Sequence, residues 1–348
     1  MICMKNDKRL IQYHTDDPGQ IYEYIKKSRF AAEVFTDDMD AAFPFNAGML
    51  KLLRYANPLK QSYYYIEDDD RYAFFTSYLN RMNLFTFGKA RLFINLQTIA
   101  FPCSLSCSGY ITNDPEWMLE YIKTIKGCKL VLNADMPFRM KGMVFGETLP
   151  TCRLKLRDDM DTVCAYMRAL RSPYRRRINL AVKNCSDISM QRISDDSIDV
   201  HPLYLQTYER SEYKLECLSK GFFDKTEGEK IVFLRDDKPL GFVLLKVNGD
   251  ELVFMLCGME YKDSECNADL YWFMLYNIVA YAIEHGCKQI DFGQTSEKTK
   301  LKFGALLEKR YFYAHHSNPV INFLAMAFKS ILEYKYSFPE YRVFKDEA

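Results

Sequence analysis

The stretch KIVFLRDDKPLGFVLLKVNGDELVFMLCGM, residues 230–259, decides the fold that we predict. Apolar and β-branched residues fill three runs of this stretch, and polar residues separate the runs. Lys238-Pro239 indicates one turn, and Asn248-Gly249-Asp250 is typical of a β-hairpin. We therefore expect three consecutive strands, of which Leu240–Val247 and Glu251–Met259 pair antiparallel.

A helix and a fourth strand follow these runs. Residues Ala268 to His285 are strongly apolar and end at Gly286, a residue type that commonly closes helices. Lys288–Phe292 resembles a strand, and the helical crossover predicts that it lies parallel to Glu251–Met259. Ligands in open α/β sheets bind where the direction or order of strands changes. The end of Lys288–Phe292 is therefore the place where we expect a site.

Shorter elements extend this order at both ends, and together they predict a mixed sheet over residues 186–318. The order is β-α-α-β-β-β-α-β-α-β. The added elements are a strand at Ile188–Ile193, helices at Asp199–Tyr213, Leu218–Lys225 and Ser296–Phe303, and a final strand at Lys309–His315.

The first half of the chain repeats the later part of this order in element type, although not in matching residues. Two aromatic-rich runs in Gln61–Phe87 are separated by the acidic triplet Asp68–Asp70, and a strand follows at Leu92–Phe101. After the polar loop Pro102–Asn113, Asp114 and Pro115 are typical of a helix start. That helix ends at Gly127, and a strand follows at Lys129–Asn133. An amphipathic stretch from about Asp158 to Lys183 is expected to bridge the halves.

Composition excludes several classes of protein. The chain has 348 residues, of which 48% are hydrophobic, enough for about two domains. A net charge of +1 argues against a protein that holds DNA by bulk charge. The 11 cysteines are scattered without a CxxC pair, so we expect reduced thiols, no metal site and a cytoplasmic location. No N-terminal signal peptide is evident, and the apolar stretch Val320–Phe328 is too short to span a bilayer.

Two further segments carry a resemblance to a known family. Residues 290–296, IDFGQTS, and residues 300–305, KLKFGA, resemble the late signature of Fem-type, peptidoglycan-biosynthesis-like acyltransferases of the GNAT superfamily. Residues 208–214, YERSEYK, resemble the early helix of the same group, and the resemblance extends over about residues 155–318. It implies an α/β fold with two GNAT-like domains in tandem. We expect a degenerate domain at residues 1–155, and a second at 156–348 with the bridging helix and a C-terminal helix.

The resemblance also implies a set of site residues. On the donor side these are Asp291, Gly293, Gln294, Thr295 and Ser296, which offer polar groups to a carbonyl or phosphate. Lys300 and Tyr313 are the expected catalytic residues, the lysine stabilising developing negative charge and the phenol protonating a leaving thiolate. Lys300 and Lys302 stand two apart on a short helix, so they should point in different directions. Acceptor-side candidates are Tyr208, Ser211, Tyr213, Arg175 and Arg176. The alternatives are core packing for Tyr313, a solvated surface position for Lys300 and a solvated helix face for the two arginines.

The predicted function is transfer of an acyl group from an acyl-CoA-like thioester to an amine or hydroxyl acceptor, such as a small molecule or a cell-wall precursor. The segment Tyr261–Ala268, which corresponds to the usual CoA pyrophosphate loop, lacks glycine. A non-catalytic GNAT-fold binding protein is therefore one alternative. A transferase that uses aminoacyl-tRNA on a peptidoglycan precursor is another, but the chain lacks the long helical arm that assists tRNA in that group.

Overall fold

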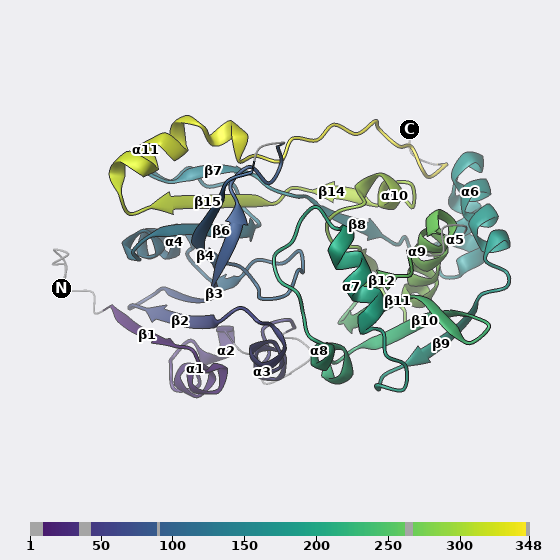
Figure 1. The fold of residues 1–348 in the computed structure, drawn as a ribbon, viewed down its shortest axis with the longest axis horizontal. Coiled ribbons are helices and arrows are strands. Elements are labelled where there is room, and N and C mark those ends of the chain that lie inside the picture. The colour runs from purple at the N-terminus through teal and green to yellow at the C-terminus, as the bar shows by residue number, and fades with distance from the viewer. Residues whose placement is uncertain (1–9, 35–42, 89–90, 262–266, 346–348) are drawn as a thin grey trace. The chain divides into compact units, whose positions relative to one another are not determined.

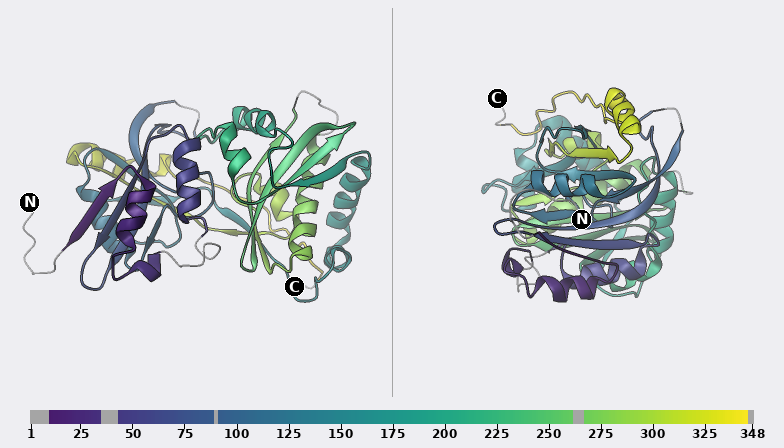
Figure 2. Two further views of the ribbon diagram at one scale, coloured as in Figure 1. Left: turned by 90° about the horizontal axis from the view of Figure 1, so that it is seen from below. Right: turned by 90° about the vertical axis from the view of Figure 1, so that its left-hand side faces the viewer.

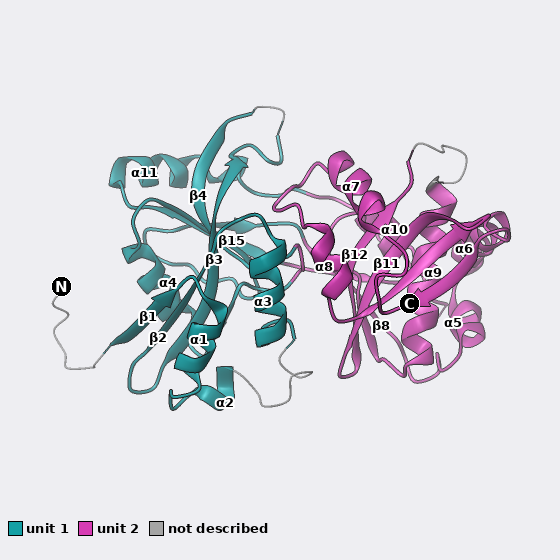
Figure 3. Cartoon of the chain, turned by 60° about the horizontal axis from the view of Figure 1, so that its bottom comes forward, with its two compact units in different colours: residues 1–103, 107–149, 310–335 teal, residues 104–106, 150–309, 336–348 magenta. Residues whose placement is uncertain are grey.

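The computed structural model describes residues 10–34, 43–88, 91–261 and 267–345. Contacts divide the chain into two compact units, which Figure 3 shows in separate colours. The first unit comprises residues 1–103, 107–149 and 310–335, and the second comprises residues 104–106, 150–309 and 336–348. Each unit has a mixed sheet with helices packed on it (Figure 2), which confirms the predicted α/β class.

The first unit begins with a strand, three helices and a long antiparallel meander (Figure 1). Asp17, Asn46 and Asp114 cap three of its helices through side-chain oxygens, as such residues commonly do. Its elements are β1 (Ile11–Thr15), α1 (Pro18–Ile25), α2 (Ala31–Val34), α3 (Ala47–Ala56), β2 (Gln61–Glu67), β3 (Tyr72–Asn83), β4 (Phe93–Ile99), β5 (Tyr110–Thr112), α4 (Pro115–Thr124), β6 (Cys128–Ala134), β7 (Val144–Glu147), β15 (Tyr311–His316), α11 (Pro319–Ala327) and the 3₁₀ turn η1 (Lys329–Ile331).

The second unit contains the stretch from which the fold was predicted. Its elements are β8 (Thr151–Lys155), α5 (Val163–Ala169), α6 (Ser172–Asn184), β9 (Ser189–Ile193), α7 (His201–Arg210), α8 (Lys220–Lys225), β10 (Glu229–Arg235), β11 (Lys238–Asn248), β12 (Glu251–Met259), α9 (Asn267–Glu284), β13 (Gln289–Asp291), α10 (Glu297–Leu301) and β14 (Leu306–Glu308). As predicted, β11 pairs antiparallel with β12, and β13 pairs parallel with β12.

The two sheets follow one plan, strand for strand. The first runs β1-β2-β3-β4-β6-β15-β7, with β5 added beside β3, and the second runs β9-β10-β11-β12-β13-β8-β14. In both sheets a helix, α4 or α9, precedes the strand that makes the one parallel pairing, β4 with β6 or β12 with β13. The duplication suggested by element types is therefore real at the level of topology.

One strand of each sheet comes from the other end of the chain. The place next to β6 is taken by β15, and the equivalent place next to β13 is taken by β8. The strand predicted at Lys309–His315 forms as β15, but it pairs in the first sheet and not in the sheet predicted over residues 186–318, where the unpredicted β14 lies at the edge. The C-terminal helix α11 also belongs to the first unit. A linear division at residue 155 does not describe these units, since strand pairing across the sheet outweighs proximity in sequence.

The bridging stretch forms two helices, α5 and α6, and not one. Leu170 leaves helical geometry and makes an isolated β-bridge to Phe344, and Pro173 stands in the first turn of α6. Proline lacks the amide that a continuous helix would need, so a new helix starts there. Both helices pack on α9 within the second unit.

Two glycines show that α7 and α9 cover opposite faces of the second sheet. A Cβ on Gly258 would meet main-chain atoms of Leu203 and Tyr204 in α7, whereas one on Gly241 would meet Met274 in α9. Gly258 is paired with Phe242, and neighbouring residues 241 and 242 point to opposite faces of β11. The face covered by α9 carries the main core cluster of this unit.

Candidate functional site

The strands β12 and β13 diverge at the place where the sequence predicts a site. Their pairing runs from Glu251 opposite Gln289 to Val253 opposite Asp291, while β12 continues to Met259. The register of β12 against β11 shifts at Met255, which is the mark of a β-bulge. A β-bulge increases the local twist of a strand. This bulge lies just beyond Val253, the last residue of β12 that pairs with β13. The end of β12 is therefore released from its parallel neighbour.

The segment after β13 makes a tight turn of unusual backbone conformation. Gly293, Thr295 and Ser296 all have positive φ angles, of 70°, 62° and 51°. Such angles are costly for residues with a side chain and are enriched at functional sites. The Asp291 carboxylate accepts a 2.7 Å hydrogen bond from the Gly293 amide, which fixes the start of the turn. Burial raises the pKa of Tyr271, and the nearby Ser296 side chain opposes the shift.

Lys300 lies beneath this turn and holds it. Its Nζ donates to the carbonyl of Gln294 at 2.7 Å and to that of Gly293 at 3.4 Å, and the side chain is buried. Burial lowers the pKa of Lys300. Lys302 lies near the rings of Trp272 and Tyr341 instead, so the two lysines do point in different directions as predicted.

Two cysteine thiols face the same lysine. Burial raises the pKa of Cys152 to about 12 and that of Cys257 to about 11, and in both cases Lys300 opposes the shift. Both thiols therefore stay protonated at neutral pH. A thiol without thiolate character is a poor nucleophile, so neither is suited to carry an acyl group.

Asp291 is the most fully engaged of the predicted donor-side residues. In addition to the Gly293 amide, its carboxylate accepts a 2.6 Å hydrogen bond from the Ser106 hydroxyl and a 3.4 Å contact from Arg153. Asp291 and Ser106 are both buried. The loop Pro102–Asn113 was assigned from the sequence to the first half of the chain, yet its residues 104–106 belong to the second unit. Composition could not reveal this partnership.

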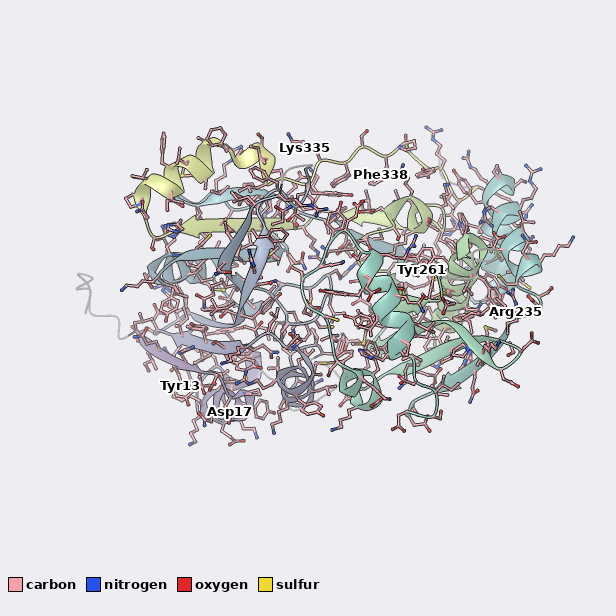
Figure 4. All side chains as sticks on the ribbon, viewed as in Figure 1. Tyr13, Asp17, Arg235, Tyr261, Lys335 and Phe338 are labelled. Atoms are coloured by element: carbon pink, nitrogen blue, oxygen red, sulfur yellow. The ribbon has the colours of Figure 1, made fainter. Side chains whose placement is uncertain are left out.

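The predicted acceptor-side residues lie on α7 and the loop after it. Met259 at the end of β12 donates its amide to Thr207 of α7, and Tyr261 donates to Gln206. Figure 4 labels Tyr261 beside α7. Tyr208 is near the end of this helix and is half-buried, so α7 brings it to the same side as the released end of β12.

Ser211 and Tyr213 have a local role. The Ser211 hydroxyl donates to the carbonyl of Tyr213 and accepts from its amide, which closes the turn after α7. This turn leads directly into the buried residue Glu216. The two predicted residues thus shape the loop that carries it.

Glu216 is the residue that the sequence reasoning missed. One carboxylate oxygen accepts hydrogen bonds from the Ser104 amide, at 2.6 Å, and from its hydroxyl, at 2.7 Å. The other oxygen, Oε2, is buried without a hydrogen-bond partner among the described residues. Burial raises the pKa of Glu216 to about 7, although the bonds from Ser104 oppose the shift. A single glutamate between Leu215 and Cys217, in the segment LECLS, gave no pattern by which it could be singled out.

Ser104 and Ser106 join the two predicted groups. Ser104 binds Glu216. The pKa of Tyr208 is raised by burial first, then by Cys217 and by Glu216. Ser106 binds Asp291, at the start of the donor-side turn. The segment 104–106 therefore connects the loop after α7 with the end of β13 inside the second unit.

Arg175 and Arg176 are not brought to this group. Both are on α6, which packs against α9, and α9 covers the face of the sheet opposite to α7. Arg175 donates to the carbonyl of Leu170, and Arg176 is exposed. Their positions fit the solvated helix face that was the alternative interpretation.

Tyr313 belongs to the first unit and lies in its core. Its hydroxyl donates to the carbonyl of Met136 at 2.9 Å and accepts from the Phe138 amide at 2.6 Å, and its ring packs on Phe145. Burial raises the pKa of Tyr313. A buried phenol bonded to main chain on both sides has a structural role, so we assign it no part in the chemistry.

Within the described parts of the chain, no group of three or more His, Cys, Asp or Glu side chains could hold a metal ion. A search of the same residues finds no helix that could cross a membrane. Most of the segment corresponding to the CoA pyrophosphate loop, residues 262–266, lies outside the described residues.

Neither a protein-family model nor a curated protein sequence matches the chain. Solved structures are similar to it. The C-terminal DUF2156 domain of a proposed lysylphosphatidylglycerol synthetase from Agrobacterium fabrum is similar over 90% of this chain and 97% of its own, at 11% identity and a TM-score of 0.50. A tandem GNAT protein from the clavulanic acid biosynthesis pathway is similar over 89% and 99%, at 11% identity and a TM-score of 0.48. FemX is similar over 92% and 100%, at 12% identity and a TM-score of 0.46.

At such identities the similarity concerns the fold alone. The first of these structures matches nearly the whole of both chains. Within this chain, the two sheets share one strand order, and the strands β12 and β13 diverge beside a bulge. The predicted architecture of two similar α/β domains in one chain is thereby confirmed.

Proposed function

We propose that this chain is an acyltransferase that moves an acyl group from a thioester donor, of the acyl-CoA type, to an amine or hydroxyl acceptor. The observation that carries the proposal is the pair of hydrogen bonds from Ser104 to Glu216 and from Ser106 to Asp291. They join the loop after α7 to the turn after β13, where an acceptor and a donor would have to meet.

Glu216 is the proposed general base. Its Oε2 is buried and has no hydrogen-bond partner among the described residues, so it has the capacity to accept a proton. A base works best when its pKa is near the working pH, and burial raises the pKa of Glu216 to about 7. The carboxylate takes the proton from the acceptor N–H or O–H as the nitrogen or oxygen attacks the acyl carbonyl.

Donor-side groups stabilise the reacting carbonyl and the leaving group. Attack forms a C–N or C–O bond, the C–S bond of the thioester breaks, and the thiolate leaves and takes up a proton. Lys300 holds the turn of residues 293–296 by hydrogen bonds to two carbonyls. Its positive charge stabilises the negative charge that develops on the donor during the reaction. Transfer is direct in this proposal, because the nearby thiols of Cys152 and Cys257 stay protonated.

A thiol-release assay tests the proposal. The full chain is incubated with acetyl-CoA or longer acyl-CoAs and with panels of primary amines and alcohols, and free thiol is followed over time. We expect thiol release only when an acceptor is present. The rate of release should rise as the pH passes about 7, because Glu216 then loses its proton and can act as a base. Glu216→Gln should reduce the rate by about a hundredfold or more, and the exposed neighbour Glu212→Gln should not.

Three results would count against the proposal. If calorimetry detects no binding of any acyl-CoA, the donor is of another kind or the chain is a binding protein. Formation of an aminoacyl product that RNase abolishes would replace the acyl-CoA donor by aminoacyl-tRNA. If Glu216→Gln and Glu212→Gln have equal activity, Glu216 is a structural support for Ser104.

A further inference from the structure

The helix α11 has its polar and apolar sides reversed for a helix on a protein surface. Within Pro319–Ala327 the one buried side chain is polar, Asn322. The exposed side chains include Phe323, 69% exposed, and Val320, 66% exposed. The exposed apolar side chains of this region are Val320, Ile321, Phe323, Leu324, Met326, Phe328 and Ile331.

Polar contacts fix the helix in this orientation. Asn322 donates to the carbonyl of Gly142 at 2.8 Å and accepts from the amide of His316 at 2.9 Å. Beyond η1, Tyr334 donates its amide to Glu147 of β7, and the Glu333 side chain packs over Gly146, where a Cβ would come within 2.5 Å of it. The apolar face is therefore held outward by its anchoring.

The exposed residues form a continuous stripe. Phe323, Leu324 and Phe328 follow Val320 by three, four and eight residues, which places these four on one side of α11 and its C-cap, and Ile331 extends the stripe into η1. No charged residue occurs between Pro319 and Phe328. An exposed apolar surface of this kind on a soluble protein marks an interaction site.

Basic residues surround the stripe. Lys126 precedes Gly127, whose amide and carbonyl both bond Ser317 at the start of α11, and Lys141 precedes the Gly142 carbonyl that binds Asn322. Lys329 and Lys335 follow the helix, and Figure 4 labels Lys335 at this end. All four are exposed. The Glu333 side chain packs over Gly146 of β7, and its carboxylate also lies 3.7 Å from the Lys329 ammonium, so Lys329 is partly neutralised and the other three lysines carry the positive charge.

We propose that α11 is an interfacial anchor, which docks this unit on a membrane surface that carries anionic headgroups. A helix of nine residues is about 14 Å long, too short to span a bilayer but long enough to lie in its interface with apolar side chains inserted. The lysines around it would contact phosphate and other anionic groups. A second copy of the chain is a poorer occupant, because a two-fold contact would bring the same lysines together.

Vesicle flotation tests the inference with the full chain. We expect binding to vesicles of phosphatidylcholine with phosphatidylglycerol, weaker binding to phosphatidylcholine alone, and loss of the difference at high salt. Phe323→Ser with Phe328→Ser should weaken binding by on the order of a hundredfold. Leu79→Ser is the matched control, because Leu79 of β3 is also 69% exposed and should leave binding unchanged. Lys126→Gln with Lys141→Gln should weaken binding to the anionic vesicles alone.

Three results would overturn the inference. One is failure of the unmodified chain to float with anionic vesicles. The second is equal binding by the double phenylalanine variant, measured after thermal unfolding has shown that its fold is intact. The third is a concentration-dependent dimer that the same variant abolishes, which would assign the stripe to a second copy. No readout depends on acyl transfer, so this inference stands or fails independently of the proposed function.

Discussion

The hydroxyl of Ser106 donates a 2.6 Å hydrogen bond to the carboxylate of Asp291, 185 residues further along the chain. Both side chains are buried, so the bond forms away from bulk water. Because Asp291 also binds the amide of Gly293, this one contact ties the segment 104–106 to the turn that follows β13.

Ser106→Ala should lower the free energy of unfolding by about 2 kcal/mol, because a buried carboxylate loses a short hydrogen bond. Urea denaturation measures the loss. Ser108→Ala is the control, since the half-buried Ser108 makes a longer 3.2 Å bond to the neutral carbonyl of Tyr110 and should cost under about 1 kcal/mol. Equal losses would mean that Ser106 contributes no more than an ordinary surface hydroxyl.

Glu216 should make stability fall as the pH rises. Its pKa is raised from 4.5 to about 7 in the folded state, so the folded chain binds this proton more tightly than the unfolded chain. The resulting stability is fully present below pH 4.5 and is lost as the pH rises through about 7. The loss is at most about 3 kcal/mol.

Glu216→Gln removes this titration. The unfolding free energy of the variant should therefore change less with pH between 4.5 and about 7, the two pKa values of Glu216. Unfolding curves at several pH values measure it. Glu212→Gln, at an exposed position of the same loop, should keep the slope of the unmodified chain. A slope unchanged in Glu216→Gln would show that the buried carboxyl does not titrate in this range.

Lys300 and Lys302 should differ in their effect on transfer. Lys300→Met removes the cation beneath the turn and should reduce kcat/KM in the thiol-release assay by about tenfold to a thousandfold. Lys302→Met should cost much less, since that ammonium lies near Trp272 and Tyr341 instead. Both variants lose one positive charge from the same short helix, so charge alone cannot produce a difference. Equal activity would remove Lys300 from the proposed site.

Gly258 should tolerate no side chain. A Cβ there would lie 2.5 Å from main-chain atoms of Leu203 and Tyr204, which a rotamer change cannot move. Gly258→Ala should therefore displace α7 from β12 and cost about 3 kcal/mol, as overpacking does. Gly249→Ala meets open space at a φ of +60° and should cost about 1 kcal/mol. Thermal unfolding compares the two, and similar melting temperatures would contradict the close packing of α7.

Local sequence determined the central elements of the second unit. The turn Asn248-Gly249-Asp250 and the apolar runs beside it predicted β11 and β12 and their pairing, and the crossover predicted a parallel β13. These features were readable because turn residues and alternation of side chains act over a few residues. The donor-side turn was found for the same reason, since it directly follows a strand.

Only the tertiary structure decided which distant segments complete each sheet and the site. Strands β8 and β15 pair with partners far from them in sequence, and strand composition does not specify a partner. Glu216 became distinctive through burial and through Ser104, 112 residues away. The same applies to α11, whose apolar stretch was visible in the sequence although its outward orientation was not. Asn322 binds the main-chain carbonyl of Gly142 and the main-chain amide of His316. Every residue has these main-chain groups, so the sequence does not indicate which of them Asn322 binds.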